Sequence, residues 1–338
     1  MRAYQITSNK GIDSLQISDI KCGDPGPGEV KVRLRASSIN YRDLVTVEDP
    51  DARGLALPFI PNSDGAGEII SVGRGVKDFA VGERVVTCFF QNWLNGEITS
   101  SAMNSALGGA LEGVLREKRT FKKDGVIKIP ESLSYIEAAT LPCAGLTAWH
   151  ALVEKGCVTA GDTVLLLGTG GVSLFALQFA VMHGALPIIT SSSDEKLERA
   201  KALGAWKTIN YVDNPDWSNE VLTLTGGAGV DHVVEVGGAG TLAKSIESTK
   251  IGGNIYLIGI LASGEVNPTA LMRKSLNLHG IYVGSRAMFE RMNKAIDANN
   301  LRPVIHRTFA FEEAKEAYRT MRLKQHAGKL VIDIGDQI

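Results

Sequence analysis

The stretch TVLLLGTGGVS at residues 163–173 constrains the fold most, because an apolar run enters a glycine-rich turn and then a helix-like segment. A buried parallel strand that ends in such a turn brings the unpaired N–H groups of the next helix to the edge of the sheet. Phosphate groups bind well there. The pattern predicts a dinucleotide-binding turn, although the motif alone is not specific. The residues of this turn are Gly168, Thr169, Gly170, Gly171 and Val172.

The small residues of this turn have separate roles. Gly168 would make the tight turn, and Gly170 would let the backbone approach a pyrophosphate. The third small residue of the fingerprint is Ser173 rather than glycine, so we expect the helix and the strand to pack less closely there.

The end of the next strand bears on the choice between NAD and NADP. Residues 186–190 read as a strand, and Ser191 and Ser192 follow where NAD-binding units carry an acidic residue for the ribose hydroxyls. A carboxylate would repel the 2′-phosphate of NADP, whereas hydroxyls and the nearby Lys196 can bind it. We therefore expect NADP(H) to be preferred over NAD(H). The alternative is that the serines begin a polar loop, with one of them capping a helix at 194–203 and Lys196 solvated.

Composition excludes several classes of partner. The 338 residues are many for one core and indicate two domains. A net charge of −1 argues against binding to nucleic acid or to membranes, and no apolar run approaches a transmembrane span. The cysteines are scattered without a Cys-x-x-Cys pair, which favours reduced thiols and a cytoplasmic location. They are Cys22, Cys88, Cys143 and Cys157.

The first 120 or so residues read as β-rich. Apolar and charged residues alternate over Gly28–Ala36, as in a half-buried strand, and 67–72 and 83–88 are further short strands between glycine-rich turns. Residues 91–113 are rich in Asn, Ser, Gly and Ala with little periodicity, and we expect a long surface loop there.

From about residue 134 the pattern alternates between helix and strand. Repeated units of this kind with apolar strands predict a doubly wound parallel sheet covered on both faces. Two amphipathic helices and a last strand (287–299, 311–323 and 329–334) are expected to return to the first domain. The expected helices of the alternating region are 134–155, 174–183, 194–203, 215–224 and 239–249, and the expected strands are 163–168, 186–190, 206–210, 232–236, 254–258 and 276–283.

The whole chain resembles the medium-chain dehydrogenase/reductase superfamily. The resemblance is carried by PGPGEVKVRLRASSINYRD, PFIPNSDGAGEIISVG, VGERVV, AATLPCAGLTAWHAL, GDTVLLLGTGGVS, DEKLERAKALGA, GVDHVVEVGG and GKLVIDI, in this order. It implies a GroES-like catalytic domain, residues 1–128 and 286–338, a Rossmann domain, residues 129–285, and an active site in the cleft between them. Within the family the chain is similar to the zinc-free branch, which includes quinone oxidoreductases and enoyl reductases.

The resemblance also locates the positions that bind catalytic zinc in metal-containing members. They are occupied here by Asn40, Ser63 and Cys143. Asn and Ser are poor zinc ligands, and one thiolate cannot build a tetrahedral site. Residues 91–113, where those members carry a cysteine-rich lobe, contain no cysteine. We expect no zinc, with Cys143 as a small buried apolar side chain.

Without a Lewis acid, hydrogen-bond donors must meet the negative charge that hydride transfer creates. A quinone or enone delocalises that charge and is favoured over a simple alcohol. Zinc-free relatives place a tyrosine near the nicotinamide, which implies Tyr41 as donor; alternatively its ring packs with the hydroxyl in water. Asn40 and Ser63 are candidates to bind substrate or water. Asp64 is a candidate by analogy with an acidic neighbour, or else it braces Gly65.

The remaining cofactor contacts are implied by the resemblance. Thr147 matches a position that contacts nicotinamide, although a helical threonine can also bond its own backbone. Tyr211 matches a tyrosine at the adenosine end, and Lys329 a basic residue near the pyrophosphate, with a solvated lysine as the alternative. Strand ends face the crevice of a doubly wound sheet, which adds Val236, Gly237, Ile258 and Gly259.

The sequence thus predicts a zinc-independent, NADPH-dependent oxidoreductase that reduces a small quinone or α,β-unsaturated carbonyl. The alternatives are an alcohol dehydrogenase-like reductase of aldehydes or ketones, and an NADP-binding protein without turnover, similar to lens crystallins. A methyltransferase on a similar sheet is disfavoured by the whole-chain pattern. Relatives commonly form homodimers or homotetramers, and nothing in the sequence identifies the substrate.

Overall fold

The computed structural model describes residues 1–259 and 261–335 and contains two compact units. Unit 1 joins Met1–Leu146 to the chain from Gly284 onward, and unit 2 is Thr147–Val283. The first unit is discontinuous, and its N-terminal part extends to Leu146. The reason is that helix α3 (Tyr135–Ala138) packs on strands of unit 1. Residues 336–338 of the expected catalytic domain lie outside the described residues.

Unit 2 is built on a parallel sheet of six strands in the order β10-β9-β8-β11-β12-β13. The order reverses between β8 and β11. Ligands of doubly wound sheets bind at the carboxyl ends of the strands beside that reversal. The strands are β8 (Thr163–Leu166), β9 (Leu186–Ser191), β10 (Lys207–Asn210), β11 (Val230–Glu235), β12 (Thr249–Leu257) and β13 (Asn277–Gly280).

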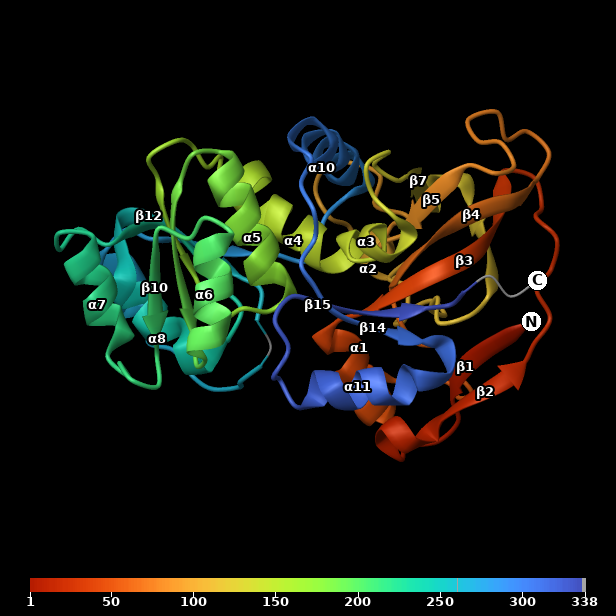
Figure 1. The fold of residues 1–338 in the computed structure, drawn as a ribbon, viewed down its shortest axis with the longest axis horizontal. Helices are drawn as coiled ribbons and strands as arrows, with labels where there is room; N and C mark the ends of the chain where they lie inside the picture. Colours follow the sequence, from red (N-terminus) through yellow and green to blue (C-terminus); the bar gives the residue numbers. More distant parts are fainter. Residues whose placement is uncertain (260, 336–338) are drawn as a thin grey trace. The chain divides into compact units, whose positions relative to one another are not determined.

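Helices cover both faces of this sheet, which confirms the predicted doubly wound fold (Figure 1). Helices α5 and α6 lie on one side of the strands and α7 on the other, packed on α8. Helix α5 begins at Gly171, three residues before the expected start, because the glycine turn itself enters the helix. The helices are α5 (Gly171–Met182), α6 (Asp194–Ala202), α7 (Trp217–Leu224), α8 (Ala239–Ser248) and α9 (Thr269–Arg273).

The expected single helix at 134–155 is wrong. After α3 the chain forms a π-helical segment Leu141–Gly145, a short α4 (Leu146–Trp149) and a second π-helical segment His150–Lys155. Pro142 has no N–H and disfavours a regular helix at its position, which the apolar periodicity alone did not reveal.

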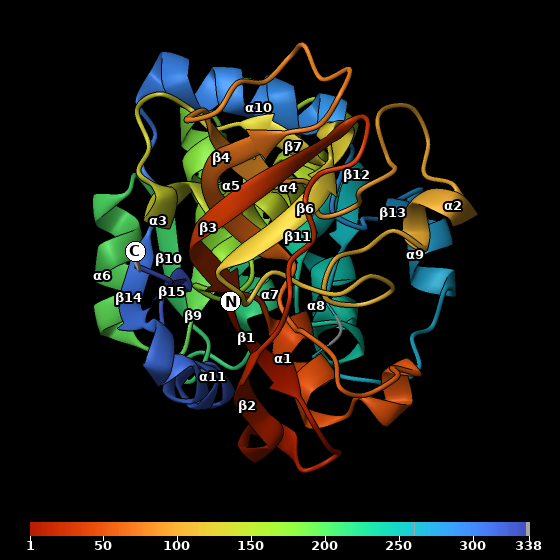
Figure 2. The same cartoon turned by 90° about the vertical axis from the view of Figure 1, so that its right-hand side faces the viewer.

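Unit 1 contains a seven-stranded sheet with the path β14-β15-β3-β4-β5-β7, and β6 pairs with β3. Figure 2 shows β3 flanked by β4 and β6. The C-terminal β15 runs antiparallel to β3, which is the return that makes this unit discontinuous. The strands are β3 (Glu29–Ile39), β4 (Asp64–Val72), β5 (Arg84–Thr87), β6 (Lys118–Lys122), β7 (Val126–Lys128), β14 (Ile305–Ala310) and β15 (Lys329–Asp333), with a separate pair β1 (Arg2–Ile6) and β2 (Leu15–Asp19).

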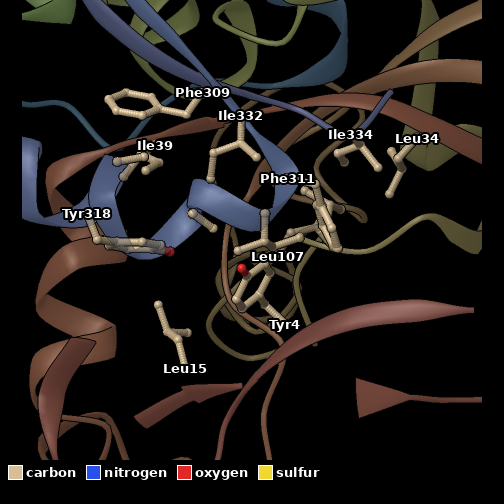
Figure 3. Packing of buried hydrophobic residues seen from close by; sticks show 14 of the residues in the cluster. Tyr4, Leu15, Leu34, Ile39, Leu107, Phe309, Phe311, Tyr318, Ile332 and Ile334 are labelled. Atoms are coloured by element: carbon tan, nitrogen blue, oxygen red, sulfur yellow. The ribbon is translucent and has the colours of Figure 1, made fainter. Parts of the chain in front are cut away.

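Helices of unit 1 contribute to one apolar core (Figure 3). Tyr4 and Phe311 meet edge to face with ring centroids 5.1 Å apart, and Tyr318 packs into the same cluster from α11. The helices are α1 (Tyr41–Glu48), α2 (Ser100–Met103), α10 (Arg286–Asn299) and α11 (Ala314–Arg322), with 3-10 turns at Gly11–Ser14, Asp51–Arg53, Lys123–Gly125 and Phe311–Glu313.

The expected surface loop at 91–113 is wrong in part. It contains α2, and Leu107 within it is fully buried. The Arg42 guanidinium satisfies this buried backbone by donating to the carbonyls of Leu107 and Gly108 at 2.8 and 3.1 Å. Within the described ranges, none of the helices combines the length and apolar character that crossing a bilayer requires.

Candidate cofactor and catalytic sites

The glycine turn between β8 and α5 leaves open space where a ligand's phosphates would lie. Gly168 adopts φ +70°, a left-handed conformation that favours glycine. A Cβ atom added at Gly168 or Gly170 would meet no atom within 4 Å. Gly171 and Val172 form the first turn of α5, and the buried Thr169 lies between the glycines. The turn therefore fits a pyrophosphate at the helix N-terminus.

Ser173 joins the first turn of α5 to the end of β8. Its hydroxyl donates to the Leu167 carbonyl at 2.7 Å, and the side chain is buried. A hydrogen bond thus links helix and strand at the position where the fingerprint carries a third small residue.

The end of β9 presents hydroxyl groups. Ser191 is buried and Ser192 is exposed, but neither caps α6, because Ser193 accepts the Lys196 N–H at 3.5 Å. The alternative that Ser191 or Ser192 caps this helix is therefore wrong, because Ser193 is the residue that does so. Lys196 is half-buried, and this burial lowers the pKa of its ammonium.

Tyr211 lies beside the same strand end. Its N–H donates to the Ser191 carbonyl at 3.0 Å, and 41% of the residue is exposed. Asp194, the first acidic residue after the serines, accepts a hydrogen bond from Asn210 at 2.8 Å. Tyr211 therefore lies next to the end of β9, directly after the residue of β10 that pairs with Ser191.

Sequence reasoning missed Glu235, a fully buried carboxylate at the end of β11. It accepts the N–H groups of Gly237 and Gly238 at 2.8 and 3.0 Å, and the hydroxyls of Thr241 (2.6 Å) and Ser245. One carboxylate therefore accepts hydrogen bonds from both the backbone and the side chains at the start of α8. The available signal was an acidic residue directly after the two valines that end the strand sequence VDHVVE.

The carbonyl of Glu235 also fixes the loop after β12. It accepts the N–H groups of Ile258 and Gly259 at 2.9 and 3.0 Å. A Cβ atom at Gly259 would lie 2.1 Å from the Val236 carbonyl carbon, so the two loops pack backbone against backbone. The predicted residues Val236, Gly237, Ile258 and Gly259 are therefore brought together at one place on the sheet edge.

Unit 1 brings Asn40, Ser63, Asp64 and Lys329 into one buried polar cluster. Lys329 is only 3% exposed, so the alternative of a solvated lysine is wrong. Its ammonium donates to the Ile39 carbonyl at 2.8 Å and to Asn40 Oδ1 at 2.5 Å. Strand β15 places this lysine, because Leu330 pairs with Ile39 of β3.

The Asp64 carboxylate is the acceptor at the centre of this cluster. It receives the Ser63 hydroxyl at 2.6 Å and the Cys143 N–H at 3.2 Å. The alternative that it braces Gly65 is wrong, since the Gly65 N–H donates to the Thr87 hydroxyl at 3.1 Å. Burial raises the pKa of Asp64, and the ammonium of Lys329 partly opposes that shift.

A second buried carboxylate, Asp43, also escaped sequence reasoning. It accepts the Asn40 N–H at 2.9 Å at the start of α1 and pairs with the Arg42 guanidinium at 3.1 Å. Burial raises the pKa of Asp43, and Arg42 opposes that shift. The Asp43 contact fixes the backbone of Asn40 and hence the acceptor that Lys329 uses.

The two other predicted residues lie apart from these contacts. Tyr41 opens α1 half-buried, with the Lys324 ammonium 5.5 Å from its ring centre. Its hydroxyl has no hydrogen-bond partner in the described part of the chain and can donate to a ligand. Thr147 is buried at the start of unit 2.

The side chains at the three expected metal positions do not fit zinc. Asn40 Oδ1 already receives an ammonium, and the Ser63 hydroxyl donates to Asp64. Cys143 is half-buried, and desolvation raises the pKa of its thiol, which opposes the thiolate that zinc requires. Residues 1–259 and 261–335 contain no group of three or more His, Cys, Asp or Glu side chains that could hold a metal ion.

Comparison with known families matches each unit. Residues 26–131 match the alcohol dehydrogenase GroES-like domain, and residues 171–298 match the family described as zinc-binding dehydrogenase. A zinc-type alcohol dehydrogenase-like protein of Schizosaccharomyces pombe is 45% identical over 96% of each chain. A 2-haloacrylate reductase of a Burkholderia species is 30% identical over 98% of each, and human quinone oxidoreductase is 27% identical over 95% of this chain and 94% of its own.

Solved structures of similar fold support the same family. A crystal structure described as an NAD-dependent alcohol dehydrogenase has a TM-score of 0.91 and 33% identity, covering 99% of this chain and all of that one. A mycobacterial protein complexed with NADPH has a TM-score of 0.82 and 26% identity, covering 98% of this chain and 99% of its own. The chain therefore belongs to the medium-chain dehydrogenase/reductase superfamily and is an NAD(P)-dependent oxidoreductase with a GroES-like and a Rossmann domain.

Proposed function

We propose that this protein is a zinc-independent, NADPH-dependent reductase of quinones or α,β-unsaturated carbonyl compounds. The observation that carries the proposal is the cluster around Asn40: an ammonium and hydrogen-bonded hydroxyl and amide groups stand where a zinc ligand set would be needed. Such groups stabilise negative charge through hydrogen bonds.

A substrate with a conjugated carbonyl suits these groups. When bound, the reduced nicotinamide supplies a hydride, and the acceptor must take up the negative charge. Conjugation spreads that charge onto an oxygen, which neutral donors and one ammonium can stabilise. Two relatives have names that refer to substrates of this class, 2-haloacrylate reductase and quinone oxidoreductase.

The residues of unit 2 would hold NADPH. The turn at 168–172 would take the pyrophosphate, and Ser192 and Lys196 would take the 2′-phosphate, with Ser191 holding the strand end. The mycobacterial structure with NADPH supports this assignment. The related NAD-dependent alcohol dehydrogenase points to the other cofactor, so the preference has to be measured.

The test combines metal analysis with a substrate panel. We expect well under one zinc per chain, activity that survives chelators, and NADPH oxidation that is fastest with an enone or a quinone. Stoichiometric zinc, or faster turnover of simple alcohols with NAD, would discard the proposal.

Two other functions remain distinguishable by the same panel. Reduction of simple aldehydes or ketones is the second candidate, favoured by the alcohol dehydrogenase-like name of the fission-yeast relative. Cofactor binding without turnover on any substrate would instead indicate a binding protein.

We also propose that the protein is cytoplasmic, which the four free cysteines support, and that it forms a homodimer or homotetramer. A mass measurement in solution checks the oligomeric state.

Tyr41→Phe tests the proposed donor. Because the hydroxyl makes no bond within the described residues, its removal should leave folding and NADPH binding nearly unchanged. Loss of one hydrogen bond to the substrate, worth about 1 kcal/mol, should lower turnover by about fivefold. Steady-state kinetics at saturating NADPH measure this change, and wild-type turnover would remove Tyr41 from the mechanism.

A further inference from the structure

Unit 1 has a surface cavity of about 260 Å³ that shares no lining residue with the polar cluster around Asn40. Its apolar side consists of Leu34 and Ile334, which are buried and lie near each other in Figure 3. Ligand pockets usually measure about 300–1,000 Å³, so this cavity suits a small molecule. The other lining residues are Arg2, Arg33, Glu117, Lys118 and Gly335.

The charged side chains of the cavity are three cations and one carboxylate. Arg2 lies on β1, Arg33 on β3 and Lys118 on β6, and Glu117 directly precedes β6. The Arg2 side chain is 26% exposed and that of Arg33 36%, and Lys118 is half-buried. A solute can therefore reach these cations, which outnumber the acidic group beside them.

Strand pairing places two of the cations opposite each other. In the antiparallel register of β3 and β6, Arg33 pairs with Lys118. Like charges at directly opposite positions destabilise a sheet. An anion beside both side chains would replace this repulsion with attraction.

The arginines of the cavity have carboxylate partners and still keep spare donors. Arg2 binds Glu117 through Nε at 2.8 Å and Glu312 through Nη1 at 2.7 Å. Arg33 makes a long contact of 3.4 Å with Glu68. Because a guanidinium has five N–H donors, each arginine keeps at least one donor that has no acceptor in the described part of the chain.

Lys118 is the cation without a counter-ion. Its ammonium makes no hydrogen bond or ion pair within residues 1–259 and 261–335. Glu68, which lies on the other side of β3, cannot serve it as well, because Arg33 shares this carboxylate with Arg35 at 2.9 Å. The positive charge of Lys118 is therefore available to a ligand.

We propose that this cavity binds phosphate, either as the free ion or as the phosphate group of a small molecule. The oxygen atoms of a tetrahedral phosphate point in several directions, so they can meet cations that come from three different strands. Guanidinium forks bind phosphate oxygens in pairs, and a lysine adds a point charge. The site lies wholly within unit 1 and does not depend on the proposed function.

The bound phosphate would join two parts of unit 1. Arg2 belongs to the separate pair of strands β1 and β2, whereas Arg33 and Lys118 belong to the seven-stranded sheet. A ligand that contacts all three is held only by the folded chain, so it raises the melting temperature of the protein.

The experiment measures phosphate binding to the full chain by isothermal titration calorimetry. NADPH or NADH, whichever binds more tightly, is kept at saturation so that the phosphate sites proposed for unit 2 are filled. Lys118→Gln should raise the Kd of phosphate about 10- to 150-fold, the range for losing one charge-assisted hydrogen bond. The control Lys122→Gln removes an exposed lysine from the same face of β6 and should leave this Kd unchanged.

Thermal unfolding gives a second readout. Without phosphate, the Tm of Lys118→Gln should equal or exceed that of the wild type, because the variant lacks the like-charge pair. Phosphate should raise the Tm of the wild type and of Lys122→Gln more than that of Lys118→Gln. Arg33→Gln, in which Glu68 keeps its contact with Arg35, should also bind phosphate more weakly.

The choice of ligand identifies the source of the phosphate. Tighter binding of glycerol 3-phosphate than of inorganic phosphate would indicate a phosphorylated small molecule, and equal binding would indicate the free ion. The proposal is overturned if the wild type does not bind millimolar phosphate, if Lys118→Gln binds it as tightly as the wild type, or if succinate, a dicarboxylate, binds more tightly than both phosphate compounds.

A shortened variant tests the end of the chain. Residues 336–338 follow the lining residue Gly335 and lie outside the described residues. Phosphate binding that is unchanged or tighter in a variant that ends at Gly335 would support the assignment to the cavity. Loss of binding in that variant would place the phosphate contact on residues 336–338 and would contradict the assignment.

Discussion

Glu235→Ala should weaken NADPH binding about 100-fold, which corresponds to about 3 kcal/mol. The substitution leaves the N–H groups of Gly237 and Gly238 and two hydroxyls of α8 without their common acceptor in the interior of unit 2. The loop after β11 would then lose its order. The loop that contains Gly259 packs against it and would become disordered as well. Fluorescence titration with NADPH measures the affinity, and hydrogen exchange over 236–241 measures the loss of order.

The matched variant Glu235→Gln separates geometry from charge. A glutamine oxygen can still accept from Gly237, Gly238 and Thr241, so we expect NADPH binding close to wild type. Glu198→Ala, an exposed glutamate paired with Lys201, controls for loss of one negative charge. Unchanged NADPH affinity in Glu235→Ala would show that these loops do not contact the cofactor.

The architecture of unit 2 could be predicted because its signals are local. Strand β8 is apolar along its length and enters a glycine turn, so strand, turn and helix α5 follow each other within one stretch of sequence. A succession of such units admits few arrangements, since crossovers between parallel strands are right-handed. The structure adds mainly the bounds of the elements.

The buried parts of unit 1 could not be predicted in this way, because their burial depends on distant partners. Leu107 lies in a segment without periodicity and is buried because Arg42, 65 residues away, satisfies the backbone around it. The π-helical turns near Pro142 are likewise invisible to a pattern of apolar residues.

The candidate site likewise combines features that the sequence could predict with features that depend on distant partners. The family resemblance singled out Asn40, Ser63, Asp64 and Lys329 separately, each from its own motif. Their hydrogen bonds depend on tertiary structure, since Lys329 and Asn40 are 289 residues apart. Burial of Lys329 reverses the expectation for a lone lysine in a sequence, and only the pairing of β15 with β3 reveals it.

Lys196→Ala should raise the Kd of NADPH about 10- to 150-fold, because a charge-assisted hydrogen bond is worth about 1.5–3 kcal/mol. The Kd of NADH should hardly change, since NADH carries no 2′-phosphate. The lysine is half-buried and desolvation lowers its pKa, so an anionic ligand beside it would stabilise the charged form of its ammonium. Titrations of both cofactors at low and high salt measure the effect, and the NADPH loss should shrink as salt screens the contact.

The neighbouring Ser192 supplies the complementary variant. Ser192→Asp places a carboxylate at the exposed end of β9, where it should repel the 2′-phosphate and accept from the ribose hydroxyls of NADH. Ser192→Asp should then bind NADH more tightly than NADPH. The control is Lys207→Ala, which removes an exposed lysine of β10 that lies over the Trp206 ring and should leave the cofactor preference unchanged. Equal losses for NADPH and NADH in Lys196→Ala would mean that this lysine supports α6 and does not recognise the phosphate, and the choice of cofactor would then rest on the serines alone.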